Sequence, residues 1–399
     1  MSIAIEERAR QLRQPTVFSY AFRSLFLVAG LWAIVGIVIW LAIFLGYLIL
    51  PTRFNPLAWH IHEMQFGFVM AAVGGFLLTA IPNWTNRLPF RGLPLALLTG
   101  LWLLGRVACL ISANLPAWLA IIADLSFPIV LLAVATRQII AARNWRSLLM
   151  TGPVAVFVIA DLLMHFESLG FAVPTGLGWR LGLAAPILLI TVIGGRIIPS
   201  FTRNWLSKRD SARLPSPHSA VDRAAVGLLH GGLIIWALLP DLHFIGTILL
   251  VAALLNAWRL SRWAGGATLA EPLLFILHVG YGWVVVGTAL LGLSLLVTVV
   301  PVASAIHALT VGAMGTMILA VMPRVTLGHT GRDLTANRAT VAIYVLINAA
   351  AIMRVAASWS TNATLILVVL SGICWITAFG LFEIVYGPML VARRLGQTT

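Results

Sequence analysis

The sequence has 399 residues, of which 60% are hydrophobic and only 10% are charged. Soluble proteins carry roughly 25% charged residues on average, so 12 acidic and 26 basic side chains are too few to cover a globular surface of this size. The composition excludes a soluble enzyme, a coiled coil and a disordered chain, and it predicts a protein that crosses the membrane many times. The net charge of +14 does not indicate a nucleic-acid partner, because the basic residues lie between apolar runs, where they orient a membrane protein.

Twelve apolar runs are long enough to cross the hydrocarbon core, which takes about 20 residues of helix. No run alternates in the manner of a strand, so we predict an all-α polytopic membrane bundle that forms a single domain over residues 1–399. The predicted spans cover roughly 22–50, 59–82, 93–112, 116–140, 147–167, 176–198, 220–239, 241–262, 271–298, 302–322, 336–357 and 363–391.

The basic residues predict how the bundle is oriented. If the N-terminus is cytoplasmic, all but four of the 26 Lys and Arg residues fall on the cytoplasmic side, and the four exceptions are Arg53, Arg106, Arg180 and Arg354. Lys and Arg accumulate in cytoplasmic loops. We therefore expect both termini in the cytoplasm.

A short motif recurs at the cytoplasmic ends of the second, sixth and tenth spans. It reads Pro-x-x-Thr at Pro82–Thr85, Pro199–Thr202 and Pro323–Thr326, with four spans from one copy to the next. The spacing favours three four-helix units around a pseudo-threefold axis. The alternative is coincidence, because Pro and Thr commonly end helices.

Histidines in the spans are the first candidates for chemistry, because ionisable groups inside a membrane are costly and are commonly functional. His60, His62 and Glu63 on the second span, and His307 on the tenth, share a level in the outer third of the bundle. We predict that His62 and His307 are axial ligands of one haem, with His60 as the alternative on the second span. No CxxCH motif occurs, so a b-type haem is expected. The competing interpretation of any one histidine is a hydrogen bond to a neighbouring helix.

A second metal site is predicted on the other face of the second span. Residues two apart on an α-helix point about 200° apart, whereas residues three apart share a face. His60 and Glu63 could therefore bind copper or the iron of a second haem, with His278 as a further imidazole if its helix packs there. Alternatively, Glu63 hydrogen-bonds a haem ligand and fixes its tautomer.

Five strings resemble the NnrS family, and the resemblance extends over nearly the whole chain, with motifs on the second, sixth and tenth spans. They are His60–Phe68 (HIHEMQFGF), Thr79–Thr85 (TAIPNWT), Gly194–Thr202 (GGRIIPSFT), His307–Gly315 (HALTVGAMG) and Leu327–Arg332 (LGHTGR). The resemblance implies a bacterial inner-membrane protein that contains haem and copper and that handles nitric oxide or relieves nitrosative stress. It implies a haem-dependent oxidoreductase acting on nitric oxide as the reaction class, with an electron donor that is not identified.

The predicted helix order is also similar to that of the catalytic subunit of haem–copper oxidases. In that subunit one histidine on the second helix and one on the tenth hold the low-spin haem, which here corresponds to His62 and His307. The sixth span has no histidine. A copper centre with three histidine ligands is therefore not expected.

A transporter or channel is the competing functional hypothesis. Asp161, Glu383 and His278 are ionisable residues within spans and could bind a substrate or relay protons. Helices that are broken in the middle of the membrane would favour this hypothesis. A visible absorption spectrum of the purified protein distinguishes a haem protein from a colourless transporter.

Overall fold

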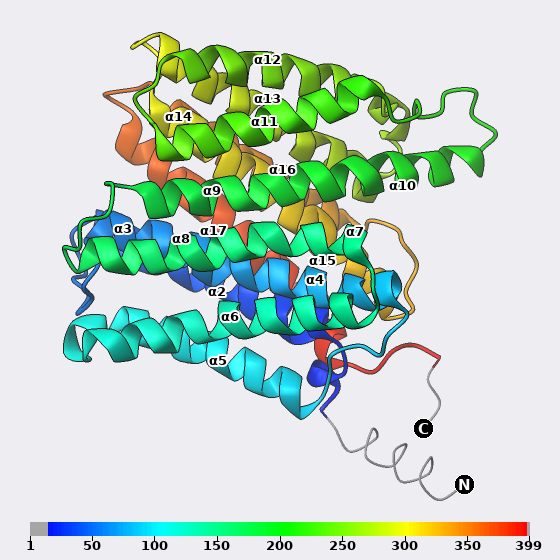
Figure 1. Cartoon of the computed structure of the whole chain (residues 1–399). Coiled ribbons are helices and arrows are strands. Elements are labelled where there is room, and N and C mark those ends of the chain that lie inside the picture. The colour runs from blue at the N-terminus through cyan, green and yellow to red at the C-terminus, as the bar shows by residue number, and fades with distance from the viewer. Residues whose placement is uncertain (1–14, 397–399) are drawn as a thin grey trace, which may run out of the picture.

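The computed structural model describes residues 15–396, and this part of the chain contains helices and no strands. Twelve of its helical segments are long and apolar enough to cross a membrane, which confirms the predicted all-α bundle of twelve spans. The helices lie side by side along one direction, and the first and last described residues are at the same end of the bundle (Figure 1). In chain order the spans are α2 (Ala21–Phe44), α3 (Pro56–His62) with α4 (Met70–Thr85), α5 (Leu93–Leu110), α6 (Ala117–Ala141), α7 (Trp145–Leu148) with α8 (Gly152–Ser168), α9 (Leu177–Leu189) with α10 (Gly195–Ser207), α11 (Ala220–Leu238), α12 (Phe244–Ser261), α13 (Pro272–Leu296), α14 (Val302–His307) with α15 (Thr316–His329), α16 (Arg338–Ala356) and α17 (Thr364–Val391).

The second, sixth and tenth spans share an unusual construction. Each is a continuous helix with a π-helical segment in its first half or middle, at Glu63–Val69, Ile190–Gly194 and Ala308–Gly315 respectively. These three spans are also the most buried of the twelve. Such π-helical segments are rare in proteins, and those that exist are frequently at functional sites. Their repetition every four spans therefore favours a functional site on these three spans.

The contacts between helices also repeat every four spans. The second, sixth and tenth spans surround a common apolar cavity of about 110 Å³, and all three contribute side chains to its wall. Around them, the last helix of each predicted four-helix unit packs against the first helix of the next unit, in the pairs α6 with α8, α12 with α13, and α17 with α2. This arrangement supports three four-helix units that close into a ring.

The Pro-x-x-Thr motifs lie inside their helices. The predicted second, sixth and tenth spans end at about 82, 198 and 322, but the helices continue to Thr85, Ser207 and His329. The prolines are accommodated near the helix ends, where Thr85 Oγ1 donates a hydrogen bond to the Ile81 carbonyl at 2.8 Å. This bond satisfies the Thr85 hydroxyl within its own helix.

A side chain from another span compensates for the irregular backbone of the sixth span. Within its π-helical segment, the carbonyl of Thr191 accepts a hydrogen bond of 3.1 Å from Arg259 Nη1 of α12. The same guanidinium donates to Tyr281 Oη of α13 at 2.7 Å and to the Asp222 carboxylate of α11 at 3.2 Å. The π-helical segment is therefore held by helices that surround it, since no water reaches such groups in hydrocarbon.

The orientation in the membrane remains a prediction, and three of the residues on which it rests, Arg8, Arg10 and Arg13, lie outside the described residues. The structure provides two positions that test it. His218 lies two residues before α11 and has an exposed side chain, whereas His243 follows α11 and is also exposed. Because α11 crosses the bundle, these residues lie at opposite ends.

We expect His243→Cys to react with a membrane-impermeant maleimide on intact cells, and His218→Cys to react only after the membrane is opened. The reason is that the predicted topology places position 243 outside and position 218 in the cytoplasm. The unsubstituted protein gives the background, because Cys109 is buried and Cys374 is half-buried. Equal labelling of both variants from outside would contradict the topology.

Candidate functional site

A group of ionisable side chains is buried where α3, α5, α6 and α8 meet. It lies near the start of the second span and of α6, and near the end of α5 and α8, which is the end predicted to face the periplasm. Each member is at most 4% exposed, although a charge inside a membrane is costly. The group, called the His62 cluster below, consists of His62, Glu63, Arg106, Asp124, Asp161 and His165.

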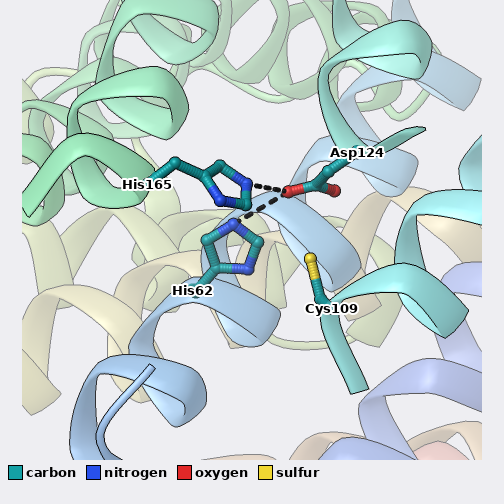
Figure 2. Close-up of side chains that lie close together, drawn as sticks. All are labelled: His62, Cys109, Asp124 and His165. Atoms are coloured by element: carbon teal, nitrogen blue, oxygen red, sulfur yellow. Dashed lines mark hydrogen bonds and ion pairs between the residues drawn. The ribbon is translucent and has the colours of Figure 1, made fainter. Parts of the chain in front are cut away.

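The imidazole of His62 is the centre of this cluster. Its Nε2 atom lies 2.8 Å from Asp161 Oδ1 and 3.0 Å from Asp124 Oδ2, and its Nδ1 atom lies 3.1 Å from Glu63 Oε1. His165 Nε2 lies 2.9 Å from the same oxygen of Asp124 (Figure 2). Both ring nitrogens of His62 therefore face carboxylates that come from three different spans.

Arg106 joins the cluster from α5. Its Nη1 atom donates to Glu63 Oε2 at 2.8 Å, and its Nη2 atom donates to Asp124 Oδ1. The neighbouring Gly105 lets α5 approach α6 closely, because a Cβ atom there would stand 3.0 Å from the Cα atom of Asp124. The ion pairs thus fix three spans relative to one another at this end of the bundle.

Apolar groups enclose the cluster. The ring of Phe54 stacks on His62 with centroids 4.6 Å apart, and Phe66 lies 5.2 Å from the same imidazole. The thiol of Cys109 points towards the histidines and Asp124 (Figure 2), and it lies within 4.8 Å of their ligand atoms. In this low-dielectric setting each ion pair is electrostatically stronger than it would be in water.

A cavity of about 410 Å³ lies on another side of the second span, and we call it the His60–His307 cavity. Its wall includes both histidines, the indole rings of Trp40 and Trp375, and the guanidinium of Arg354. Residues two apart on a helix point in different directions, which explains why His60 lines this cavity while His62 belongs to the buried cluster.

The two histidines of this cavity have ring nitrogens available for a ligand. His60 stacks on Trp40 with centroids 4.3 Å apart, and its buried Nδ1 atom has no hydrogen-bond partner. His307 Nδ1 lies 2.6 Å from the Ala303 carbonyl. Since a carbonyl only accepts, this nitrogen carries the proton, and the Nε2 atom of His307 keeps a free lone pair.

The structure groups the predicted site residues into three places. His60 lies with His307, and His62 lies with Glu63. His60 and Glu63 would share a face of a regular α-helix, but the π-helical segment begins at Glu63, whose carboxylate contacts His62 and Arg106 instead. His278 lies elsewhere, with Nδ1 3.2 Å from the Leu274 carbonyl.

Asp124 and His165 are site residues that the spacing of histidines on the second and tenth spans does not reveal. A signal for them is present in the sequence, since each is an ionisable residue within two turns of the end of an apolar span that is predicted to be periplasmic. Depth alone cannot show that they meet, because helix rotation decides which neighbour each side chain faces.

A comparison with protein families gives one match. The family model described as NnrS protein matches residues 16–394, which includes all twelve spans, the His62 cluster and the His60–His307 cavity. No curated protein matches the sequence.

We expect Arg106→Met to lower the melting temperature of the purified protein markedly. Removal of one partner from a buried ion pair costs about 3–5 kcal/mol, and here it leaves Glu63 and Asp124 without their guanidinium. The matched control is Arg53→Met, because Arg53 is an exposed arginine, where a substitution changes stability by about 0.5 kcal/mol or less. Equal melting temperatures of the two variants would show that these ion pairs do not stabilise the fold.

Proposed function

Because this chain belongs to the NnrS family, we propose that it is a membrane protein that binds a b-type haem in the His60–His307 cavity and handles nitric oxide there. The observation that carries the proposal is the convergence of two imidazoles, one from the second span and one from the tenth, on one cavity of about 410 Å³. Histidine pairs on facing helices are a common way to hold haem iron.

The residues present fit such a group. The unpartnered Nδ1 atom shows that His60 is not committed to another contact, and the bond of His307 to the Ala303 carbonyl orients its ring. A carbonyl partner of this kind fixes the tautomer of a metal-binding histidine. Arg354 supplies a positive charge in the same wall, which suits a haem propionate.

His60 and His307 would hold the iron from two helices, and Trp40 would keep the His60 ring in place by stacking. When bound, the haem would supply one-electron exchange, and its iron would coordinate a diatomic gas where the gas replaces one of the two imidazoles. The reaction class that fits is oxidoreduction of nitric oxide, with electrons from a separate donor. The protein would reside in the inner membrane of a bacterium, in contact with lipid.

On the second span the proposal assigns the haem to His60, although the histidine spacing alone favours His62. Both nitrogens of His62 face carboxylates at 2.8–3.1 Å, so a bond from His62 to haem iron would require the cluster to be rebuilt. His62 is also absent from the wall of the cavity that His307 lines.

The apolar cavity on the central axis supports a role with a small gas. It is lined by side chains such as Val69, Ile190 and Met317, and it shares Val69 and Met314 with the His60–His307 cavity. Apolar cavities in proteins stay dry and take up apolar guests such as xenon. Nitric oxide is a small molecule of weak polarity, so these walls would favour its entry over that of water.

Transport has less support. Asp161 belongs to the His62 cluster near the predicted outer end, whereas His278 and Glu383 lie near the opposite end of their spans. The second, sixth and tenth spans contain π-helical segments but continue as helices through them, so they lack the broken backbone that forms many transporter sites.

We expect the purified protein to show a Soret band, with α and β bands that sharpen on reduction, and a Soret shift when added nitric oxide replaces one of the two imidazoles. His60→Ala and His307→Ala should each lose the haem or convert its spectrum, because each would remove one axial ligand. His230→Ala is the matched control, since His230 bonds Thr191 at 2.8 Å and lies in neither site.

A folded but colourless wild-type protein would contradict the proposal. A spectrum that changes in His62→Ala and His307→Ala but not in His60→Ala would instead assign the axial pair to His62 and His307. An unchanged spectrum in all three variants would place the haem outside both candidate pairs.

A further inference from the structure

The His62 cluster is separate from the cavity proposed for the haem, and it has the properties of a second site. We infer that His62, Asp124, Asp161 and His165 hold one divalent transition-metal ion, which staples the second, fourth and fifth spans together near the predicted outer end of the bundle. The inference does not depend on the haem, because none of the four residues lines the His60–His307 cavity.

The first argument is the spacing of four atoms. The contacts of His62 Nε2 with Asp124 Oδ2 and Asp161 Oδ1 measure 3.0 and 2.8 Å, and those of His165 Nε2 with the same oxygens measure 2.9 and 3.8 Å. Bonds of about 2.0–2.2 Å to a tetrahedral ion would separate the ligand atoms by about 3.3–3.6 Å. Shifts of about 0.5 Å or less would therefore bring these four contacts into the range expected for a tetrahedral ion.

The second argument is the balance of charge. The cluster contains the carboxylates of Glu63, Asp124 and Asp161 but the single guanidinium of Arg106. With neutral imidazoles, two negative charges remain without a partner, in a place where an uncompensated charge costs several kcal/mol. One divalent cation neutralises the cluster.

The third argument is an oxygen without a donor. Asp161 Oδ2 is buried and has no hydrogen-bond partner, and the whole side chain is at most 1% exposed. Buried polar atoms are nearly always paired, and each exception needs an explanation. A cation beside Asp161 would stabilise its carboxylate without any further donor.

Glu63 completes the arrangement from outside the ligand set. Its Oε1 atom accepts a hydrogen bond from His62 Nδ1–H at 3.1 Å, which leaves the Nε2 lone pair of His62 for the ion. A carboxylate behind a histidine ligand is a recurrent feature of metal sites. The mixture of imidazole and carboxylate suits Zn²⁺ and its neighbours, whereas Mg²⁺ and Ca²⁺ prefer oxygen ligands alone.

The site would be structural. Four protein ligands fill a tetrahedral shell and leave no open position for a substrate, and all four side chains are buried. The thiol of Cys109, within 4.8 Å of three of the ligand atoms, forms one wall. The ion would join helices that are far apart in the sequence, in a way that resists their separation.

The test is elemental analysis of the intact protein, produced in medium with added Zn²⁺ and purified without a chelator. Wild type is expected to carry about one equivalent of divalent transition metal per chain beyond any haem iron. In Asp161→Asn and His165→Ala this content should fall at least about 10-fold, while the matched controls Asp222→Asn and His230→Ala keep it. The melting temperature should fall when wild type is stripped of metal, but not when Asp161→Asn is treated in the same way.

A folded wild-type protein without divalent metal would overturn the inference, and the cluster would then be a network of ion pairs around a charged His62. Wild-type metal content in both Asp161→Asn and His165→Ala would overturn it as well, by placing the ion elsewhere. Asp161→Asn nearly conserves side-chain volume, so it decides the question if His165→Ala does not fold. The haem spectrum should be unchanged in Asp161→Asn, which separates failure of this site from failure of the haem proposal.

Discussion

The cost of an unpaired charge or backbone polar group in hydrocarbon is the constraint on which the rest of this structure depends. Each such group costs several kcal/mol, so the chain spans the membrane only as helices, and every irregularity needs a partner. Arg259 supplies a donor to the Thr191 carbonyl in one π-helical segment. Arg106 forms ion pairs with Glu63 and Asp124 in the His62 cluster. Charged side chains and irregular backbone groups would each be unfavourable alone in the membrane. Paired with one another, they form the contacts that fix one span against another.

The three central spans show how a repeated construction produces different sites. All three carry a π-helical segment and a proline in their second half, towards the end predicted to be cytoplasmic, and together they line most of the apolar cavity between them. The polar residues of the three spans differ. The second span has two histidines and a glutamate just before and at its π-helical segment, the tenth has one histidine directly before its segment, and the sixth has Thr191 within it. A common scaffold thus presents imidazoles at two of three equivalent positions.

The second span connects the two candidate sites. Because His60 and His62 lie two residues apart, one faces the cavity shared with His307 and the other faces the carboxylates of the cluster. Any shift of this helix along its axis would move both imidazoles together. The ion pair between Glu63 and Arg106 resists such a shift, so the rigidity of the cluster would also hold the geometry of the proposed haem site.

The sequence by itself determined the twelve spans, their grouping in fours, the expected orientation and the resemblance to a family. These depend on local quantities, which are the length of apolar runs, the position of basic residues and short strings such as HIHEMQFGF at His60–Phe68. Only the tertiary structure decided that His60 meets His307 and that His62 meets Asp124, Asp161 and His165. Those groupings join spans that are separated by many tens of residues, and they depend on the rotation of each helix about its axis. A π-helical segment changes that rotation along a single span, so a regular α-helical projection places Glu63 with His60, whereas the folded chain pairs it with His62 and Arg106.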